Sequence, residues 1–287
     1  MSNIPSYSHP EVLCETGWVA ENISNPIIRI LEVDYDPENA YHEGHIPGAY
    51  LVWWKKDIND ADRRDIINKQ QFEALMSKIG ATPDTELVLY GDFNNWFAAF
   101  AFWVFRYYGH KKIKIMNGGR KKWELEKRAY TKQDSTSAEG RSKYIAQPPD
   151  EGVRAYLSDV KRAMEKAETI MVDVRSPKEF KGEITAPPEY PTEHAQRGGH
   201  IPGAANIPWA QAVREVDGTF KSAQELRTLY QERGITPDKE VIAYCRIGER
   251  SSHTWFVLKY LLGYPSVRNY DGSWTEWGNM IGNPIAK

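Results

Sequence analysis

An internal repeat constrains the fold of this chain more than any other feature. Residues 44–49 read Gly-His-Ile-Pro-Gly-Ala, and the same six residues return at 199–204, at an offset of 155. The apolar run 86–90 returns as 240–244 at an offset of 154. A period near 150 residues has the size of a domain and far exceeds the unit of a solenoid. The chain of 287 residues is therefore predicted to contain two copies of one domain.

Short apolar runs alternate with helical patterns in both copies. In the first copy we expect strands at 27–33, 86–90 and 112–116 and helices at 16–22, 69–79 and 95–108. In the second we expect a helix at 158–166, strands at 169–174 and 240–244, and a helix over 253–262 that Ser251 and Ser252 cap. This alternation predicts an α/β fold in which each copy has a mostly parallel central sheet flanked by helices.

Composition marks the boundaries between the copies. The first domain is predicted to span 1–130 and the second 153–287, because residues 131–152 have the polar, proline-containing composition of a linker. The second copy also carries an insertion at 182–198 that is rich in Pro, Glu and Gly. We expect a surface loop there, which either closes over a site or only decorates the domain.

Charge and composition exclude several classes of function. A net charge of −2 attracts neither nucleic acid nor an anionic membrane, and no apolar run approaches the ~18 residues of a membrane span. Two cysteines make no disulfide framework, and no Cys/His spacing indicates a metal site, so we expect neither a metal nor a cofactor. The N-terminus shows no signal-peptide pattern, and we expect a cytoplasmic protein.

The stretch after the second-copy strand 240–244 reads Cys245-Arg246-Ile247-Gly248-Glu249-Arg250-Ser251. Ligands of parallel sheets bind at the carboxyl ends of strands, which is where Cys245 falls. Loop amides, a helix dipole and the charges of Arg246 and Arg250 are expected to lower the pKa of Cys245 and to bind an anion beside it. A buried, inert cysteine is the alternative, and the charged neighbours argue against it.

The first copy lacks this chemistry. Gly91 takes the place of Cys245, and neither arginine has a counterpart there, because Asp92 and Trp96 occupy the equivalent positions. The first domain is therefore predicted to be catalytically inactive and to close the site of the other copy from one side.

The chain resembles the tandem-domain rhodaneses, the thiosulfate sulfurtransferases, over nearly its whole length. The features that carry the resemblance are the two Gly-His-Ile-Pro-Gly-Ala segments, the segment Tyr-Asp-Gly-Ser-Trp-Thr-Glu-Trp at 270–277, and the six-residue loop from Cys245 to Arg250. The resemblance implies a catalytic C-terminal domain with its site at the domain interface. It also implies that Cys245 takes the outer sulfur of thiosulfate as a persulfide and passes it to cyanide, a thiol or a thioredoxin-like protein. Arg250 is then the better candidate for the substrate contact, with Arg246 beside it.

Three other functions stay open as alternatives to thiosulfate sulfurtransferase. Relatives that use 3-mercaptopyruvate have a small uncharged loop, whereas this one has two arginines. Dual-specificity phosphatases place five residues between Cys and Arg, and here only 246–249 intervene. A non-catalytic binding module is disfavoured by the intact Cys245.

Several residues outside the loop are weaker candidates. Asp173 and Arg175 end a strand, and they either bond to the active loop or form a structural salt bridge, with equal weight. His45 and His200 occupy equivalent places in both copies and are expected to hold the turns, and Cys14 is expected to be inert.

Overall fold

A computed structural model describes residues 6–135, 142–187 and 194–287, which form two compact units. The unit that we call N-terminal contains Glu11–Asp150 together with Arg214–Phe220. The C-terminal unit contains Glu151–Val213 and Lys221–Lys287, together with residues 6–10. Each unit therefore includes one short segment from the other half of the chain.

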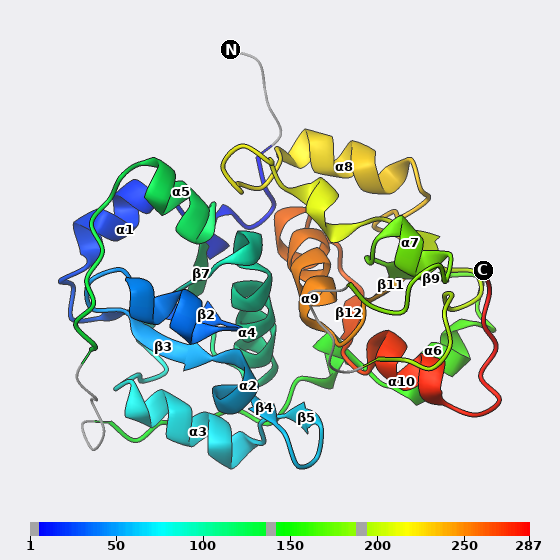
Figure 1. The fold of residues 1–287 in the computed structure, drawn as a ribbon, viewed down its shortest axis with the longest axis horizontal. Coiled ribbons are helices and arrows are strands. Elements are labelled where there is room, and N and C mark those ends of the chain that lie inside the picture. The colour runs from blue at the N-terminus through cyan, green and yellow to red at the C-terminus, as the bar shows by residue number, and fades with distance from the viewer. Residues whose placement is uncertain (1–5, 136–141, 188–193) are drawn as a thin grey trace. The chain divides into compact units, whose positions relative to one another are not determined.

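The N-terminal unit is built on a five-stranded parallel sheet (Figure 1). Its strands lie in the order β1 (Leu13–Cys14), β7 (Ile113–Met116), β6 (Glu86–Tyr90), β2 (Ile28–Asp34) and β3 (Tyr50–Trp53). Apolar side chains of α1 (Thr16–Asn22) and α5 (Gly119–Leu125) cover one face, and α4 (Trp96–Tyr107) packs on the strands from the other. The remaining elements are α2 (Trp54–Asp57), α3 (Lys69–Lys78) and a small hairpin of β4 (Asn59–Asp60) and β5 (Asp65–Ile66).

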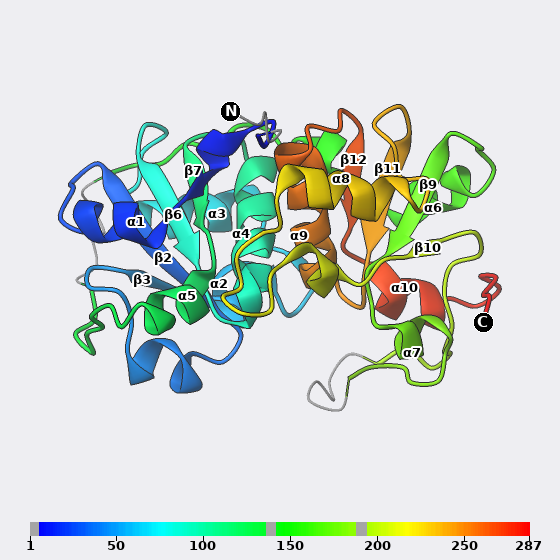
Figure 2. The same ribbon diagram turned by 90° about the horizontal axis from the view of Figure 1, so that it is seen from above.

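The C-terminal unit repeats this sheet. Its parallel strands lie in the order β10 (Ala205–Asn206), β9 (Thr169–Asp173), β11 (Glu240–Tyr244), β12 (Val267–Tyr270) and β8 (Arg154–Ala155). Helices α6 (Leu157–Ala163) and α10 (Ser273–Asn279) cover one face, and α9 (Glu249–Phe256) packs on β11 and β12 from the other (Figure 2). Two more helices, α7 (Pro177–Phe180) and α8 (Ala223–Gln231), complete the unit. Read from its β8 end, the order matches the first sheet strand for strand, which confirms the duplicated α/β fold.

Most of the expected elements are found within one or two residues of their predicted ends. The central strands 86–90 and 240–244 and the helix 16–22 have the predicted bounds. The prediction for the helix after the active loop was wrong at its start. It begins at Glu249, so that Ser251 and Ser252 lie inside its first turn and do not cap it. A π-helical turn, Val257–Leu261, then ends it.

The two histidines hold equivalent turns, as expected. His45 stacks on Tyr41 with ring centroids 3.7 Å apart, and His200 stacks on Phe180 at 3.5 Å. The residue after each histidine donates its backbone N–H to the tyrosine that ends the central strand, at 3.0 Å in the first copy and 3.1 Å in the second. The repeated segments therefore fasten a loop to the carboxyl end of each sheet.

The segments predicted as linker and insertion are partly anchored. Tyr144, in the linker, is buried, and its hydroxyl lies 2.9 Å from His110 Nδ1. Ala195, near the end of the insertion, belongs to the core of the C-terminal unit, and Trp274 donates to the carbonyl of Arg197 at 2.9 Å. Residues 136–141 of the predicted linker and 188–193 of the predicted insertion lie outside the described residues. Within the described ranges no helix has the length and apolarity that crossing a bilayer requires.

Candidate active site

Cys245 lies directly after the central strand β11, at the carboxyl end of the C-terminal sheet. The strand pairs Tyr244 with Asp173 on one side and with Tyr270 on the other, so the loops after all three strands meet at this edge. Cys245 is fully buried, and Arg246 and Arg250 are nearly so. The structure therefore brings the predicted loop residues together at one point.

Gly248 makes the tight turn of this loop possible. Its φ of 98° lies in the left-handed region that favours glycine, and α9 begins at the next residue. A Cβ atom at this position would lie 2.7 Å from Cβ of Asp271, closer than real contacts allow. The loop can accept no side chain here without moving away from the end of β12.

We expect Gly248→Ala to distort the active loop while leaving the rest of the sheet intact. The added methyl group meets Asp271 and forces an L-residue into the left-handed region, which together cost about 1–3 kcal/mol. The expected result is a clear loss of any activity that depends on Cys245 and a modest fall in unfolding free energy, measured by initial rates and urea titration. Gly234→Ala, which also has a positive φ but nothing within 4 Å of its Cβ, is the control for backbone strain alone. An active loop that tolerates alanine at 248 would contradict this account.

The segment that follows β12 makes hydrogen bonds to the backbone of the loop that contains Cys245. Ser273 Oγ accepts the backbone N–H of Cys245 at 3.0 Å, and Trp274 N donates to the carbonyl of Cys245 at 3.1 Å. Thr275 N donates in the same way to the carbonyl of Arg246 at 3.0 Å. Sequence reasoning used this segment only to recognise the resemblance and missed Ser273 as a support. The signal that could have found it is the Asp-Gly turn directly before a serine.

Three groups lie around the sulfur of Cys245. The backbone N–H of Gly248 points at Sγ from 3.1 Å, and Sγ in turn lies 3.4 Å from Oε2 of Glu249. The hydroxyl of Ser251 lies 3.6 Å from Sγ and 2.6 Å from Oδ1 of Asn269. A backbone amide, a carboxylate and a hydroxyl thus surround this sulfur atom.

The expectation of a lowered thiol pKa was wrong. Burial raises the pKa of Cys245, and the negative charge of Glu249 raises it further. Arg250 and the hydrogen bonds of Ser251 act in the opposite direction without offsetting burial. The protein thus holds Cys245 as a neutral thiol that can donate to Glu249.

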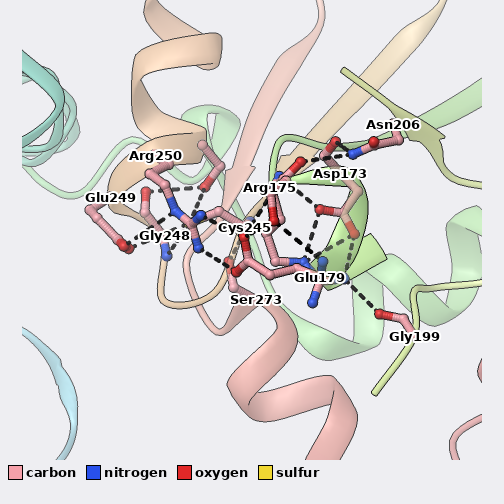
Figure 3. A network of polar contacts seen from close by, with 12 residues as sticks. Asp173, Arg175, Glu179, Gly199, Asn206, Cys245, Gly248, Glu249, Arg250 and Ser273 are labelled. Carbon is pink, nitrogen blue, oxygen red and sulfur yellow. Dashed lines mark hydrogen bonds and ion pairs between the residues drawn. The ribbon is translucent and has the colours of Figure 1, made fainter. Parts of the chain in front are cut away.

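Arg250 forms a buried ion pair that the sequence analysis did not foresee. Its Nη1 and Nη2 atoms each donate to a carboxylate oxygen of Glu179 at 3.0 Å (Figure 3). Burial alone would raise the pKa of Glu179, but the charge and hydrogen bonds of Arg250 outweigh it and hold that pKa below its ordinary value. Glu179 is therefore ionised and fixes the guanidinium beside the cysteine.

Glu179 is placed by the short helix α7. Ser176 and Glu179 form a capping box, in which Ser176 Oγ accepts from Glu179 N and the carboxylate accepts from Ser176 N. The pattern Ser-Pro-Lys-Glu at 176–179 shows this box in the sequence, but nothing in the sequence shows that it lies against Arg250.

Asp173 and Arg175 form the structural salt bridge that was one of their two predicted roles. Both side chains are fully buried, and Arg175 Nε donates to Asp173 Oδ1 at 3.0 Å. Arg175 Nη2 also donates to the carbonyl of Gly199 at 2.7 Å, which ties the second Gly-His-Ile-Pro-Gly-Ala segment to β9. The charge of Arg175 also helps to lower the pKa of Glu179, the partner of Arg250.

The equivalent loop of the N-terminal unit has no thiol. Phe93, Asn94 and Asn95 all have positive φ, so this turn is wound differently from the one after β11. Burial raises the pKa of Asp92 to about 7. The other cysteine, Cys14, is buried, and desolvation raises the pKa of its thiol to about 12, which agrees with an inert residue. Among the residues that the structure describes, no cluster of His, Cys, Asp and Glu could hold a metal ion.

Comparison with known families identifies the repeated unit. A family model described as "Rhodanese-like domain" matches the chain twice, over residues 15–126 and 157–280. The chain belongs to the rhodanese family. Each matched range contains four of the five strands of one sheet, and the loop that follows β11 lies in the second range.

Similar proteins cover nearly the whole chain. "Sulfur carrier protein TtuD" of Thermus thermophilus is 56% identical over 284 residues, which are 98% of this chain and 98% of that protein. A protein of Saccharopolyspora erythraea with the name "Putative thiosulfate sulfurtransferase" is 51% identical over 278 residues, 97% of each. The solved structure of wild-type EanB shares the fold, with a TM-score of 0.88 and 24% identity over 98% of this chain and 70% of that one. This rhodanese is thus a tandem-domain member of a sulfurtransferase family.

Proposed function

We propose that this rhodanese moves the sulfane sulfur of thiosulfate to a thiophilic acceptor through a persulfide on Cys245. The observation that carries the proposal is the position of Sγ, which lies 3.1 Å from a loop N–H in a turn that also holds two buried arginines. A nucleophilic sulfur beside hydrogen-bond donors and cations suits attack on a dianion.

Two steps account for the transfer. The thiolate of Cys245 attacks the outer sulfur of thiosulfate, the S–S bond breaks, and sulfite leaves with the electron pair of that bond. The N–H of Gly248, 3.1 Å from Sγ, is proposed to stabilise charge on the transferred sulfur, and the buried Arg246 and Arg250 of the same loop are proposed to bind the sulfite oxygens. Arg250 keeps unused guanidinium N–H groups after its two bonds to Glu179. In the second step an acceptor attacks the outer persulfide sulfur and restores the thiolate.

The acceptor is proposed to be a small thiophile or a protein thiol. Cyanide suits the first role, and a thioredoxin-like dithiol or a sulfur-accepting protein suits the second. The name of the 56% identical relative, a sulfur carrier, favours delivery to another protein. With neither a membrane nor a nucleic acid among its expected partners, the protein is proposed to act in the reducing cytoplasm.

The test is thiocyanate formation from thiosulfate and cyanide, with mass spectrometry of the protein before cyanide is added. We expect turnover, and a mass gain of one sulfur atom, about 32 Da, that cyanide removes. Parallel assays use 3-mercaptopyruvate as donor and an aryl phosphate as substrate. Faster sulfur loading from 3-mercaptopyruvate than from thiosulfate would make 3-mercaptopyruvate the donor. Phosphate release without sulfur loading would overturn the proposal.

A further inference from the structure

Glu249 is the side chain whose position the two steps above leave unexplained. Its Oε2 atom lies 3.4 Å from Sγ of Cys245, within hydrogen-bonding distance for sulfur, and only 2% of the residue is exposed. A carboxylate accepts hydrogen bonds, so the proton of this contact belongs to the thiol. The loop thus pairs its nucleophile with a buried base one turn away in the sequence.

We propose that Glu249 is a catalytic residue that accepts the thiol proton of Cys245 and later returns it. This inference rests on the proposed sulfur transfer and adds to it the source of the thiolate. The enzyme then holds a thiol and a carboxylate, and converts them to a thiolate and a carboxylic acid for the attack. Net charge stays the same, because the proton moves within the pair.

The proton and electron balance of the loading step closes without a further reagent. The S–H bond of Cys245 breaks and an O–H bond forms on Glu249. The thiolate then forms the new S–S bond while the S–S bond of thiosulfate breaks and sulfite takes the electron pair. The resulting persulfide is an anion, and the carboxylic acid of Glu249 donates a hydrogen bond to it and keeps the proton until the thiolate of Cys245 is restored.

Charged groups from several elements face the pair of Cys245 and Glu249. Arg250 Nε lies 3.8 Å from Glu249 Oε1, and Arg246 belongs to the same loop. Glu179 neutralises Arg250 from α7, whereas Asp271 below the loop is paired with Arg154. The α10 side presents the neutral Ser273. A thiosulfate dianion that approaches Sγ would be repelled by an ionised Glu249, and protonation of that carboxylate removes the repulsion.

The decisive experiment is the pH dependence of sulfur loading in single turnover, with wild type beside Glu249→Gln. In wild type the reactive thiolate forms by transfer within the pair, so the rate is expected to be flat between about pH 6 and pH 8. In Glu249→Gln the thiol must ionise to solvent, and the rate is expected to rise about tenfold per pH unit over that range. Glu249→Gln is then slower than wild type at pH 6 and approaches it in alkali.

Two further variants keep the test decisive. Glu249→Asp retains the acid but withdraws it by one methylene group, and a flat profile at a lower rate is expected. Glu232→Gln, an exposed glutamate on the surface, is the control and should match wild type. A merely structural role for Glu249 would lower the rate equally at every pH, and parallel profiles for wild type and Glu249→Gln would overturn the inference.

A measurement without any sulfur donor tests the contact between Cys245 and Glu249 separately from the assignment of thiosulfate as the donor. The thiolate of Cys245 absorbs near 240 nm, and its titration, taken as the difference from Cys245→Ala, needs no sulfur donor. Because the carboxylate disfavours the thiolate, we expect Glu249→Gln to ionise at lower pH than wild type. If thiosulfate never loads the protein but this shift appears, the donor assignment fails and the electrostatic contact between Glu249 and the thiol stands. Identical titrations would overturn the pair.

Discussion

Cys245→Ala is expected to abolish sulfur transfer and to leave no persulfide after incubation with thiosulfate. The side chain provides the only thiol in the reactive loop, and loss of a nucleophile typically lowers kcat by at least about 10⁴-fold. Replacement of one buried sulfur by hydrogen leaves the loop hydrogen bonds of Cys245 to Ser273 and Trp274 in place, since these involve backbone atoms of Cys245. The measurements are thiocyanate formation and the mass of the intact protein.

Cys14→Ala is the matched control for the loss of a buried cysteine. Cys14 ends β1 in the N-terminal unit, and its thiol faces the carbonyl of Ile115 at 3.9 Å. We expect wild-type turnover from this variant. Substantial turnover by Cys245→Ala, or loss of turnover in Cys14→Ala with an intact fold, would place the nucleophile elsewhere.

Glu179→Ala is expected to lower the free energy of unfolding of the C-terminal unit by about 3–5 kcal/mol. The substitution leaves the guanidinium of Arg250 buried without the two 3.0 Å hydrogen bonds that now neutralise it. Sulfur transfer should fall as well, because an unpaired Arg250 no longer keeps its place beside the cysteine. Urea unfolding and steady-state rates measure the two effects.

Two control variants show whether the loss of stability comes from the broken ion pair of Glu179 and Arg250. Glu183→Ala, an exposed glutamate a few residues along the chain, should change stability by less than about 0.5 kcal/mol. The double variant Glu179→Ala/Arg250→Met should recover much of the loss, because it buries no unpaired charge. If the double variant is as unstable as Glu179→Ala, the loss comes from packing and not from the stranded cation.

The ion pair of Glu179 and Arg250 makes the free energy of unfolding depend on pH. The pKa of Glu179 is lower in the folded protein than in the unfolded chain, so its contribution is complete above the ordinary glutamate pKa of about 4.3. It is lost as pH falls through the lowered native value. Wild type should therefore lose more stability in acid than Glu179→Ala, which has nothing to protonate at this position.

Local patterns in the sequence were enough to predict the sheet and the place of Cys245 in the fold. The strands 86–90 and 240–244 were predicted with their observed bounds, because short β-branched runs between turn residues depend little on tertiary context. The position of Cys245 followed from the rule that parallel sheets place loops together at one edge. The repeat itself predicted two equivalent sheets.

The sequence could not reveal how deeply Cys245 is buried or which side chains from distant parts of the chain contact its loop. The arginines predicted a lowered thiol pKa, yet desolvation at a fully buried site outweighs them, and burial is a tertiary property. Glu179 lies far from Arg250 in sequence, and no periodicity connects a capping box with a later loop. Ser251 and Ser252 predict a helix cap because serine favours cap positions, but the turn at Gly248 starts the helix earlier.

Each unit completes itself with a segment from the other half of the chain, and this has a consequence for synthesis on the ribosome. Phe220 donates its backbone N–H to Asn117 at 3.0 Å, a contact inside the N-terminal unit that residues 11–150 cannot make alone. Residues 151–213 must first be translated, which takes several seconds at about 5–20 residues per second. The N-terminal unit therefore lacks this contact until about half of the C-terminal unit has been made.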